Sequence, residues 1–238
     1  MATEANNYSE RIPRVLLIKF LDSIYEKNFR MGKLYMNPIK YFQIVEEEKL
    51  SKVRRDETDG VTASFDAKKA TLEINGCQVN GLRGRINFFP PHIENINIFC
   101  MTGLSTREII SPNKKILFSD KFKTFGDKAI LIKPDCVPEF MSRIRTAIYK
   151  RKYLYACPGE PYIFTHVDYE KDDYNGSMGV FKKFNNFQWQ REWRIALYRH
   201  TKKPSSKPLI LSIGSINELC MTIDTEQLVN NGFDLIYH

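Results

Sequence analysis

The sequence predicts an α+β fold: a single domain with a mixed, largely antiparallel sheet and flanking helices. Short apolar segments rich in β-branched residues recur along the chain, Asn-Gly pairs at 75–76 and 80–81 mark tight turns, and a few intervening segments carry apolar residues at helical spacing. The 238 residues show no internal repeat and no linker of biased composition. We therefore expect one domain over 14–238, preceded by a polar tail over 1–13.

Bulk composition is typical of a soluble, globular protein, which we expect in the cytoplasm. Hydrophobic residues make up 42% and aromatic residues 13%, and no apolar run approaches the roughly 18 residues of a membrane span. The first residues lack the basic start and apolar run of a secretory signal. The five cysteines form no C-x-x-C pair and the four histidines no H-x-x-x-H pattern, so we expect reduced thiols and no metal site.

The net charge of +8 favours anionic partners such as nucleic acid, dinucleotides or acidic surfaces. The sign of the charge does not choose among them.

The N-terminal elements follow from apolar spacing and capping residues. Residues 14–20 form a short, mostly apolar run that includes β-branched residues and predict a buried strand, and 33–36 predict another. A helix between them ends at Gly32, and Asn37-Pro38 is expected to start a second helix. The apolar residues expected on the two helices are Leu21, Ile24, Tyr25 and Phe29 on the first, and Tyr41, Phe42 and Val45 on the second.

A charged segment over 46–60 leads into a β-ribbon over 61–89. The segment is a solvated connector or, alternatively, Arg54, Arg55 and Asp56 rim a pocket in which the forked arginine donors take phosphate oxygens. In the ribbon, each Asn-Gly pair predicts a hairpin turn. Arg83 and Arg85 with Phe88 and Phe89 either cover a sheet edge or meet nucleic acid.

The middle of the chain predicts two strands and one long helix. The strand over 96–102 ends in Thr102 and Ser105, whose hydroxyls suit a ribose or a turn, and a second strand covers 129–133. The helix after Pro134 and Pro138 buries a stripe of Val137, Phe140, Met141, Ile144 and Ile148. Its opposite side is either a solvated face or a nucleic-acid backbone site made of Arg143, Arg145, Lys150, Arg151 and Lys152.

The last third predicts strands over 153–155, 162–167, 189–198, 209–213 and 233–237, with a helix from Ser215 to about Cys220. A cluster of acidic residues lies between the strands predicted over 162–167 and 189–198. It forms either a charged loop or the Mg²⁺ site of a nuclease, and it contains Asp168, Glu170, Asp172 and Asp173.

The stretch 189–198 is the most informative part of the chain. As a strand it places Trp189 and Trp193 on an apolar face, and Gln190, Glu192 and Arg194 on a polar face. The polar face is either solvated, with a local Glu192 to Arg194 ion pair, or a site of chemistry.

These pieces together resemble a known motif. An early strand ending in a basic residue, a middle strand ending in Thr or Ser, and a late strand bearing Gln-x-Glu resemble the three-part motif of the ADP-ribosyltransferase superfamily. More closely, the order Lys-Phe, Gly-Lys-Leu-Tyr-Met-Asn-Pro, Phe-Cys-Met-Thr and Trp-x-x-Glu-Trp-Arg-Ile resembles an uncharacterised bacterial domain family found near phage-defence genes. The resemblance covers roughly residues 14 to 200.

The resemblance implies an ADP-ribosyltransferase-like fold, NAD as co-substrate and a role for each matched residue. It implies that Glu192 is the catalytic carboxylate, that Gln190 orients the acceptor, and that Thr102 or Ser105 holds Glu192 and the nicotinamide ribose. Lys19, followed by Phe20, matches the first basic position, where the family commonly has Arg or His. Because of this departure, Arg54 or Arg55 is an alternative contact for the dinucleotide.

The function implied is that of a toxin-like effector that modifies RNA or DNA in growth arrest or antiphage defence, and an antitoxin protein is a partner that such an effector can have. Two other hypotheses stay open. One is a non-catalytic nucleic-acid-binding module, and the other is the Mg²⁺-dependent nuclease.

Overall fold

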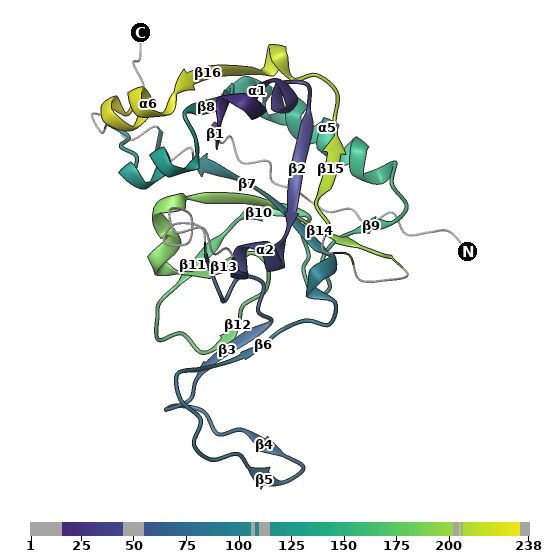
Figure 1. Ribbon diagram of the computed structural model, residues 1–238, viewed down its shortest axis with the longest axis vertical. Helices are drawn as coiled ribbons and strands as arrows, with labels where there is room; N and C mark the ends of the chain where they lie inside the picture. The colour runs from purple at the N-terminus through teal and green to yellow at the C-terminus, as the bar shows by residue number, and fades with distance from the viewer. Residues whose placement is uncertain are drawn as a thin grey trace.

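The computed structural model describes residues 16–44, 55–105, 108–109, 115–201, 205 and 207–233 (Figure 1). Its largest unit is a nine-stranded sheet whose main path is β10-β14-β7-β1-β8-β16. The bounds are β10 Phe164–His166, β14 Glu192–Arg199, β7 Ile96–Leu104, β1 Leu16–Leu21, β8 Lys128–Ile132 and β16 Cys220–Asp224. The remaining strands of this sheet are β2 (Lys33–Pro38) on β7, β15 (Leu209–Ser212) on β2, and β9 (Leu154–Tyr155) on β14.

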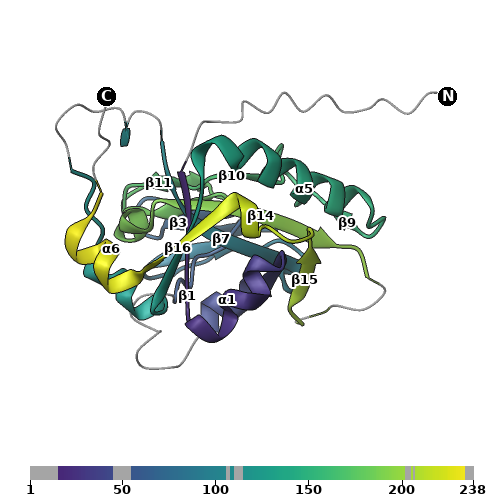
Figure 2. The same cartoon turned by 90° about the horizontal axis from the view of Figure 1, so that it is seen from above.

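The architecture confirms an α+β body that is rich in sheet and carries few helices. Strands of the large sheet pair antiparallel, whereas β11 (Asp168–Glu170) and β13 (Lys182–Phe184) pair parallel. Figure 2 shows α5 (Val137–Tyr149) and α1 (Ser23–Arg30) flanking the strands. No helix in the described part of the chain is long and apolar enough to cross a membrane.

Strand β14 has both of its faces buried, which decides where the site lies. Trp193, Ile195 and Leu197 join the largest core cluster, which also contains Phe140 of α5 and Phe29 of α1. On the other face, Ala196 joins a smaller apolar cluster. The charged side chains of β14 that share this second face are therefore enclosed and are not solvated as the ordinary amphipathic-strand interpretation expects.

The predicted N-terminal strands and first helix are present, but of the apolar residues expected on that helix only Phe29 is buried there. Leu21 belongs to β1, and Ile24 and Tyr25 are exposed. Helix α1 follows Asp22, and the chain leaves it through Gly32 at φ +73°, where a Cβ atom would lie 1.7 Å from the Gly214 carbonyl oxygen. Helix α2 (Ile39–Ile44) begins after Pro38, which is the last residue of β2. Ile39 is its buried residue, so the expected burial of Tyr41 is wrong, and Val45 lies outside the described residues.

The predicted β-ribbon is confirmed in part. Asn75 and Gly76 have φ values of 52° and 79° and join β4 (Glu73–Ile74) to β5 (Cys77–Gln78), a hairpin that projects from the body in Figure 1. The second predicted hairpin is wrong: only Gly81 of the Asn80-Gly81 pair has positive φ. Strand β6 (Arg85–Phe88) pairs with β3 (Ala63–Asp66), which in turn pairs with β12 (Gly176–Ser177).

The apolar stripe predicted for helix α5 is confirmed, since all five of its residues are buried. The predicted helix from Ser215 is wrong. A short 3-10 turn, η5 (Asn217–Leu219), leads directly into β16, and the helix of this region is α6 (Thr225–Asn231). Of the predicted strand over 233–237, Phe233 forms a bridge with Ile116, and 234–237 lie outside the described residues. The other 3-10 turns are η1 (Ile93–Asn95), η2 (Asp120–Phe125), η3 (Pro134–Cys136) and η4 (Asn185–Gln190).

Candidate functional site

The predicted strand over 189–198 begins three residues later than expected. Trp189 and Gln190 end η4, Arg191 has a left-handed φ of 45°, and β14 starts at Glu192. The Arg191 carbonyl oxygen accepts a hydrogen bond of 2.7 Å from the Gly103 N–H, which holds this turn against β7. The turn sends Trp189 onto Phe122, with ring centroids 5.0 Å apart, while Trp193 enters the main core. The expected shared face of the two tryptophans is therefore wrong.

Behind this turn lies a group of buried ionisable side chains, here called the charge cluster: Asp56, Asp59, Lys183, Glu192 and Arg194. Arg194 is its centre and has no exposed surface. Its guanidinium donates to both carboxylate oxygens of Asp59, at 2.7 and 3.0 Å, and to Glu192 Oε1 at 2.6 Å. A further bond of 2.6 Å goes to the Val180 carbonyl. Arg194 thus links strand β14 to a turn that precedes it by 135 residues.

Lys183 of β13 occupies the middle of the charge cluster. Its Nζ lies 2.9 Å from Glu192 Oε2, 3.6 Å from Asp59 and 3.9 Å from Asp56. It also donates to Gln190 Oε1 at 3.3 Å, so Gln190 does reach Glu192's surroundings, though from η4 and not from the strand. The Phe187 ring covers the ammonium at 5.0 Å from the ring centroid. Lys183 therefore stands between Glu192 and Asp56.

The charge cluster keeps Glu192 ionised. Burial alone would favour the neutral acid, but the charges of Arg194 and Lys183 hold the pKa of Glu192 below its ordinary value. Asp56 is affected in the opposite direction. Burial, reinforced by the neighbouring Asp59, raises the pKa of Asp56 despite the attraction of Lys183. The cluster contains two cations and three carboxyl groups. Lys183 and Arg194 balance the charges of Glu192 and Asp59, and Asp56 has no cation of its own to balance its charge.

Asp56 also connects the charge cluster to a pocket of about 480 Å³. It is only 3% exposed, and Thr58 satisfies its Oδ1 through the backbone N–H at 3.0 Å and the hydroxyl at 2.7 Å. Its Oδ2 has no hydrogen-bond partner among the described residues. A buried oxygen without a partner costs free energy, so this atom is suited to accept a hydrogen bond from a ligand in the pocket.

The pocket, here called the arginine pocket, carries two cations on its rim. Arg55 is paired with Glu57 at 2.8 Å. Arg85 donates to Ser64 Oγ at 2.7 Å and to the Asp172 carbonyl at 2.9 Å, and it lies over the Phe184 ring at 4.6 Å. The partners in these hydrogen bonds are uncharged, so they leave its positive charge in place. The residues that line the pocket are Arg55, Asp56, Glu57, Thr58, Arg85, Asp172, Phe184, Asn186 and Phe187.

The raised pKa of Asp56 predicts a distinctive pH dependence of stability. Between its ordinary value of 3.8 and its raised folded-state pKa, the unfolded chain releases the proton while the folded protein keeps it, so this group makes stability fall as pH rises through that window. In Asp56→Asn this fall is absent, and the difference in unfolding free energy, variant minus wild type, increases with pH. Urea unfolding from pH 4 to 8 measures it.

The matched control is Asp120→Asn, which removes a carboxylate that is 86% exposed and so separates the effect of a buried carboxyl group from that of an exposed one. A flat difference for Asp56→Asn would contradict the burial of an isolated carboxyl group.

The structure brings Thr102 to the charge cluster but not the other predicted cofactor residues. Thr102 is buried and is the register partner of Glu192. Ser105 lies past the end of β7, where its hydroxyl and backbone N–H meet Glu108 at 2.9 Å. Lys19 points to the opposite face of the sheet, because it alternates with Ile18, the register partner of Thr102. Phe20 stacks on Phe122 in a second core cluster.

Lys19 is held on its own face of the sheet by other groups. Its Nζ donates to the Cys100 carbonyl at 2.8 Å and lies 4.5 Å from the centroid of the Phe99 ring. Of the two predicted alternatives, Arg55 lines the arginine pocket, and Arg54 lies outside the described residues.

The predicted basic patch on α5 divides into two parts. Arg143 is engaged by Glu139 at 2.7 Å and Glu218 at 2.8 Å, and these hydrogen bonds raise its pKa. Arg145 lies over the Phe164 ring at 5.4 Å. Lys150, Arg151 and Lys152 follow the end of the helix, and Arg151 and Lys152 line a second pocket. The expected continuous face of five cations is therefore wrong, since Arg143 is neutralised within the protein.

The carboxylates over 168–173 do not gather as a metal site would require. Asp172 lines the arginine pocket, Glu170 faces Lys182 at 3.4 Å, and Asp173 faces Lys69 at 3.8 Å. Within the described ranges, no group of three or more His, Cys, Asp or Glu side chains is placed to hold a metal ion.

Sequence reasoning missed Asp59 and Lys183 as members of the site. Asp59 lies in a turn of mixed charge, and Lys183 stands in a Phe-Lys-Lys-Phe segment that offers no spacing signal. Nothing in the local sequence signals the burial of Lys183, since lysine is almost never fully buried unless it is paired.

Comparisons of the chain with protein-family models, with curated proteins and with solved structures found no match. Any functional assignment thus depends on the geometry of the charge cluster and the arginine pocket, together with the motif resemblance.

Proposed function

We propose that this protein is an NAD-dependent ADP-ribosyltransferase, a toxin-like effector with Glu192 as its catalytic carboxylate. The observation that carries the proposal is the adjacency of the three motif-bearing strands. Strands β14, β7 and β1 are neighbours in the sheet, and Glu192 of β14 is the register partner of Thr102 of β7. Two motif residues that are far apart in sequence thus lie side by side, whereas Lys19 of the neighbouring strand β1 points to the opposite face of the sheet.

The proposed transfer reaction requires an ionised carboxylate at the position of Glu192. When the bond between nicotinamide and ribose C1′ breaks, nicotinamide leaves with the electron pair of that bond and positive charge develops on the ribose. A carboxylate hydrogen-bonded to the ribose 2-hydroxyl stabilises this charge. The acceptor then forms a bond to C1′ and releases a proton. The lowered pKa of Glu192 keeps its side chain in the form that this step needs.

The arginine pocket has the features that a dinucleotide would use. Its volume of about 480 Å³ lies within the usual range for ligand pockets, roughly 300–1,000 Å³. Arg55 and Arg85 would take phosphate oxygens, Phe184 and Phe187 would cover an aromatic ring, and Asp56 Oδ2 would accept from a ligand N–H or O–H.

Access to Glu192 requires one local movement. Glu192 is 5% exposed, and the Lys183 ammonium lies between it and Asp56 at the pocket. A ribose that enters from the arginine pocket reaches Glu192 when Lys183 moves aside. Gln190, which already accepts from Lys183, is placed to hold the displaced ammonium or the acceptor.

The test is release of nicotinamide from NAD by the purified protein, alone and with single-stranded RNA, single-stranded DNA or lysate protein. We expect release that depends on an acceptor, and the acceptor that supports it gives the substrate class. Expression of such an enzyme would arrest growth, and a neutralising antitoxin protein would relieve the arrest. Absence of release under every condition would overturn the proposal.

A second candidate function is a non-catalytic nucleic-acid-binding module. The observation in its favour is the enclosure of Glu192, whose charge two cations already neutralise, as in a purely structural ion-pair network. This function predicts nucleic-acid binding that depends strongly on salt and needs no NAD.

A further inference from the structure

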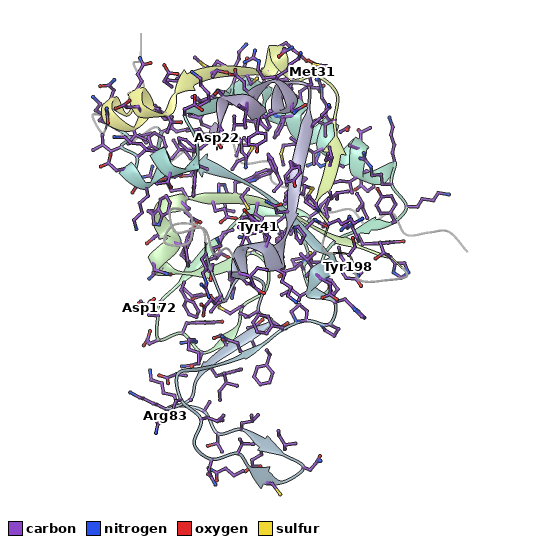
Figure 3. The ribbon with its side chains drawn as sticks, viewed as in Figure 1. Asp22, Met31, Tyr41, Arg83, Asp172 and Tyr198 are labelled. Carbon is purple, nitrogen blue, oxygen red and sulfur yellow. The ribbon has the colours of Figure 1, made fainter. Side chains whose placement is uncertain are left out.

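A second pocket lies on the far side of the molecule from the arginine pocket, where α5 meets β9. Its volume is about 490 Å³. In Figure 3, Asp172 of the arginine pocket and Tyr198, the register partner of Tyr155 in this second pocket, stand on opposite sides of the molecule. We call it the tyrosine pocket, because Tyr149 and Tyr155 both line it.

The two tyrosines of this pocket are exposed and come from a helix end and a paired strand. Tyr149 is 71% exposed and Tyr155 is 52% exposed. Tyr149 is the last residue of α5, while Tyr155 belongs to β9, which pairs with β14, and its ring lies 6.2 Å from that of His200. Ile148 and Leu154, both buried, anchor the two segments beside them. The chain therefore presents two aromatic rings to solvent beside one pocket, and neither ring belongs to the core.

The same surface is strongly basic. Residues 140–159 contain no Asp or Glu and five Lys or Arg. Arg151 and Lys152 line the tyrosine pocket with the tyrosines, and Lys150 precedes them. Within the part of the chain that the structure describes, none of these three cations forms an ion pair, in contrast to Arg143 on the same helix. Cations at a helix C-terminus stabilise the helix dipole, but that role requires no exposed aromatic rings beside them.

We propose that the tyrosine pocket binds single-stranded nucleic acid. Unpaired bases would stack on Tyr149 and Tyr155, and the backbone phosphates would meet Lys150, Arg151 and Lys152. A single strand fits better than a duplex, because the rings line a concave pocket that a base enters only after leaving its stack. The inference goes beyond the proposed function, because this pocket lies on the far side of the molecule from the arginine pocket, and binding needs neither NAD nor Glu192.

The experiment measures fluorescence anisotropy of a labelled strand of about 12 nucleotides, a length within the usual range for such sites. RNA, DNA and a duplex of the same sequence are compared across a salt series. The variant Tyr155→Ala/Lys152→Ala is expected to bind the single strand roughly five- to hundredfold more weakly, with a flatter salt dependence. The matched control is Tyr25→Ala/Lys27→Ala, which removes an equally exposed tyrosine and lysine from α1, and we expect its affinity to stay within about twofold of wild type.

The outcomes separate the possibilities. Binding of RNA, DNA or both that is lost in the pocket variant supports the proposal, and a preference between them identifies whether the 2′-hydroxyl is read. The proposal is overturned if wild type binds no single strand, if a duplex binds as tightly, or if both variants lose affinity equally. Binding of the strand by the wild-type protein, without nicotinamide release under any condition, would overturn the enzyme and leave this site standing.

Discussion

Glu192→Gln is expected to reduce acceptor-dependent nicotinamide release by about 10²–10³-fold, the usual cost of removing one preorganised electrostatic group. The substitution keeps the shape of the side chain and removes its charge. Release of nicotinamide from NAD, followed over time at saturating acceptor, measures the effect.

The charge cluster itself suggests that this variant folds. With Glu192 ionised, the cluster contains two cations, two paired carboxylates and Asp56 as an additional carboxyl group. When glutamine replaces Glu192, Asp56 can ionise next to Lys183 and restore neutrality, so its pKa is expected to fall. The loss of activity would then occur without loss of the circular dichroism spectrum or of cooperative unfolding.

Glu108→Gln is the matched control for this experiment. Glu108 is an exposed carboxylate that contacts Arg191, the residue before Glu192, at 3.5 Å. It shares the neighbourhood of Glu192 but not its burial, so its activity is expected to equal that of wild type. A Glu192→Gln variant that keeps more than about a tenth of wild-type turnover would contradict the catalytic role.

Arg194→Met is expected to destabilise the protein by roughly 3–5 kcal/mol, because it leaves charged partners buried without compensation. Arg194 is fully buried and holds Asp59 through two hydrogen bonds and Glu192 through one. Methionine fills much of the same space and supplies none of these bonds. The midpoint of urea unfolding, with its slope compared to exclude a change in cooperativity, gives the free-energy difference.

Arg143→Met provides the comparison for this measurement. Arg143 also makes two ion pairs, with Glu139 and Glu218, but both acids are more than half exposed. Exposed pairs contribute about 0–1 kcal/mol, so the loss should be small. Equal losses for the two arginine variants would mean that burial adds nothing to the ion pairs of Arg194.

The parts of the fold that depend on local sequence were predictable. The apolar stripe of α5 has helical spacing, and the Asn75-Gly76 turn needs two residues that tolerate positive φ. The break at Arg191 was not predictable, because arginine carries no preference for the left-handed conformation that it adopts. The alternation of apolar and polar residues along 189–198 therefore predicts a continuous strand where the structure has a turn.

The candidate site was predictable only in its motif residues. Glu192 and Thr102 follow from the motif, and their register pairing follows from the sheet. Asp59 and Lys183 come from other segments of the chain. Sequence spacing does not reveal that these segments fold next to Arg194. The burial of the Glu192 face was equally hidden, since an alternating strand with charged residues on one face ordinarily turns that face to solvent.

The central place of β14 has a consequence for biosynthesis. This strand lies between β7 and β10 in the sheet, yet it ends at Arg199, late in the chain. Until the ribosome has released it, the nascent chain carries β7 with most of one long apolar edge unpaired, and Asp56 and Asp59 have neither Lys183 nor Arg194 as partners. The N-terminal half can therefore not complete its core during translation, and an open β-strand edge is where nascent chains aggregate. Completion of this core therefore waits for β14.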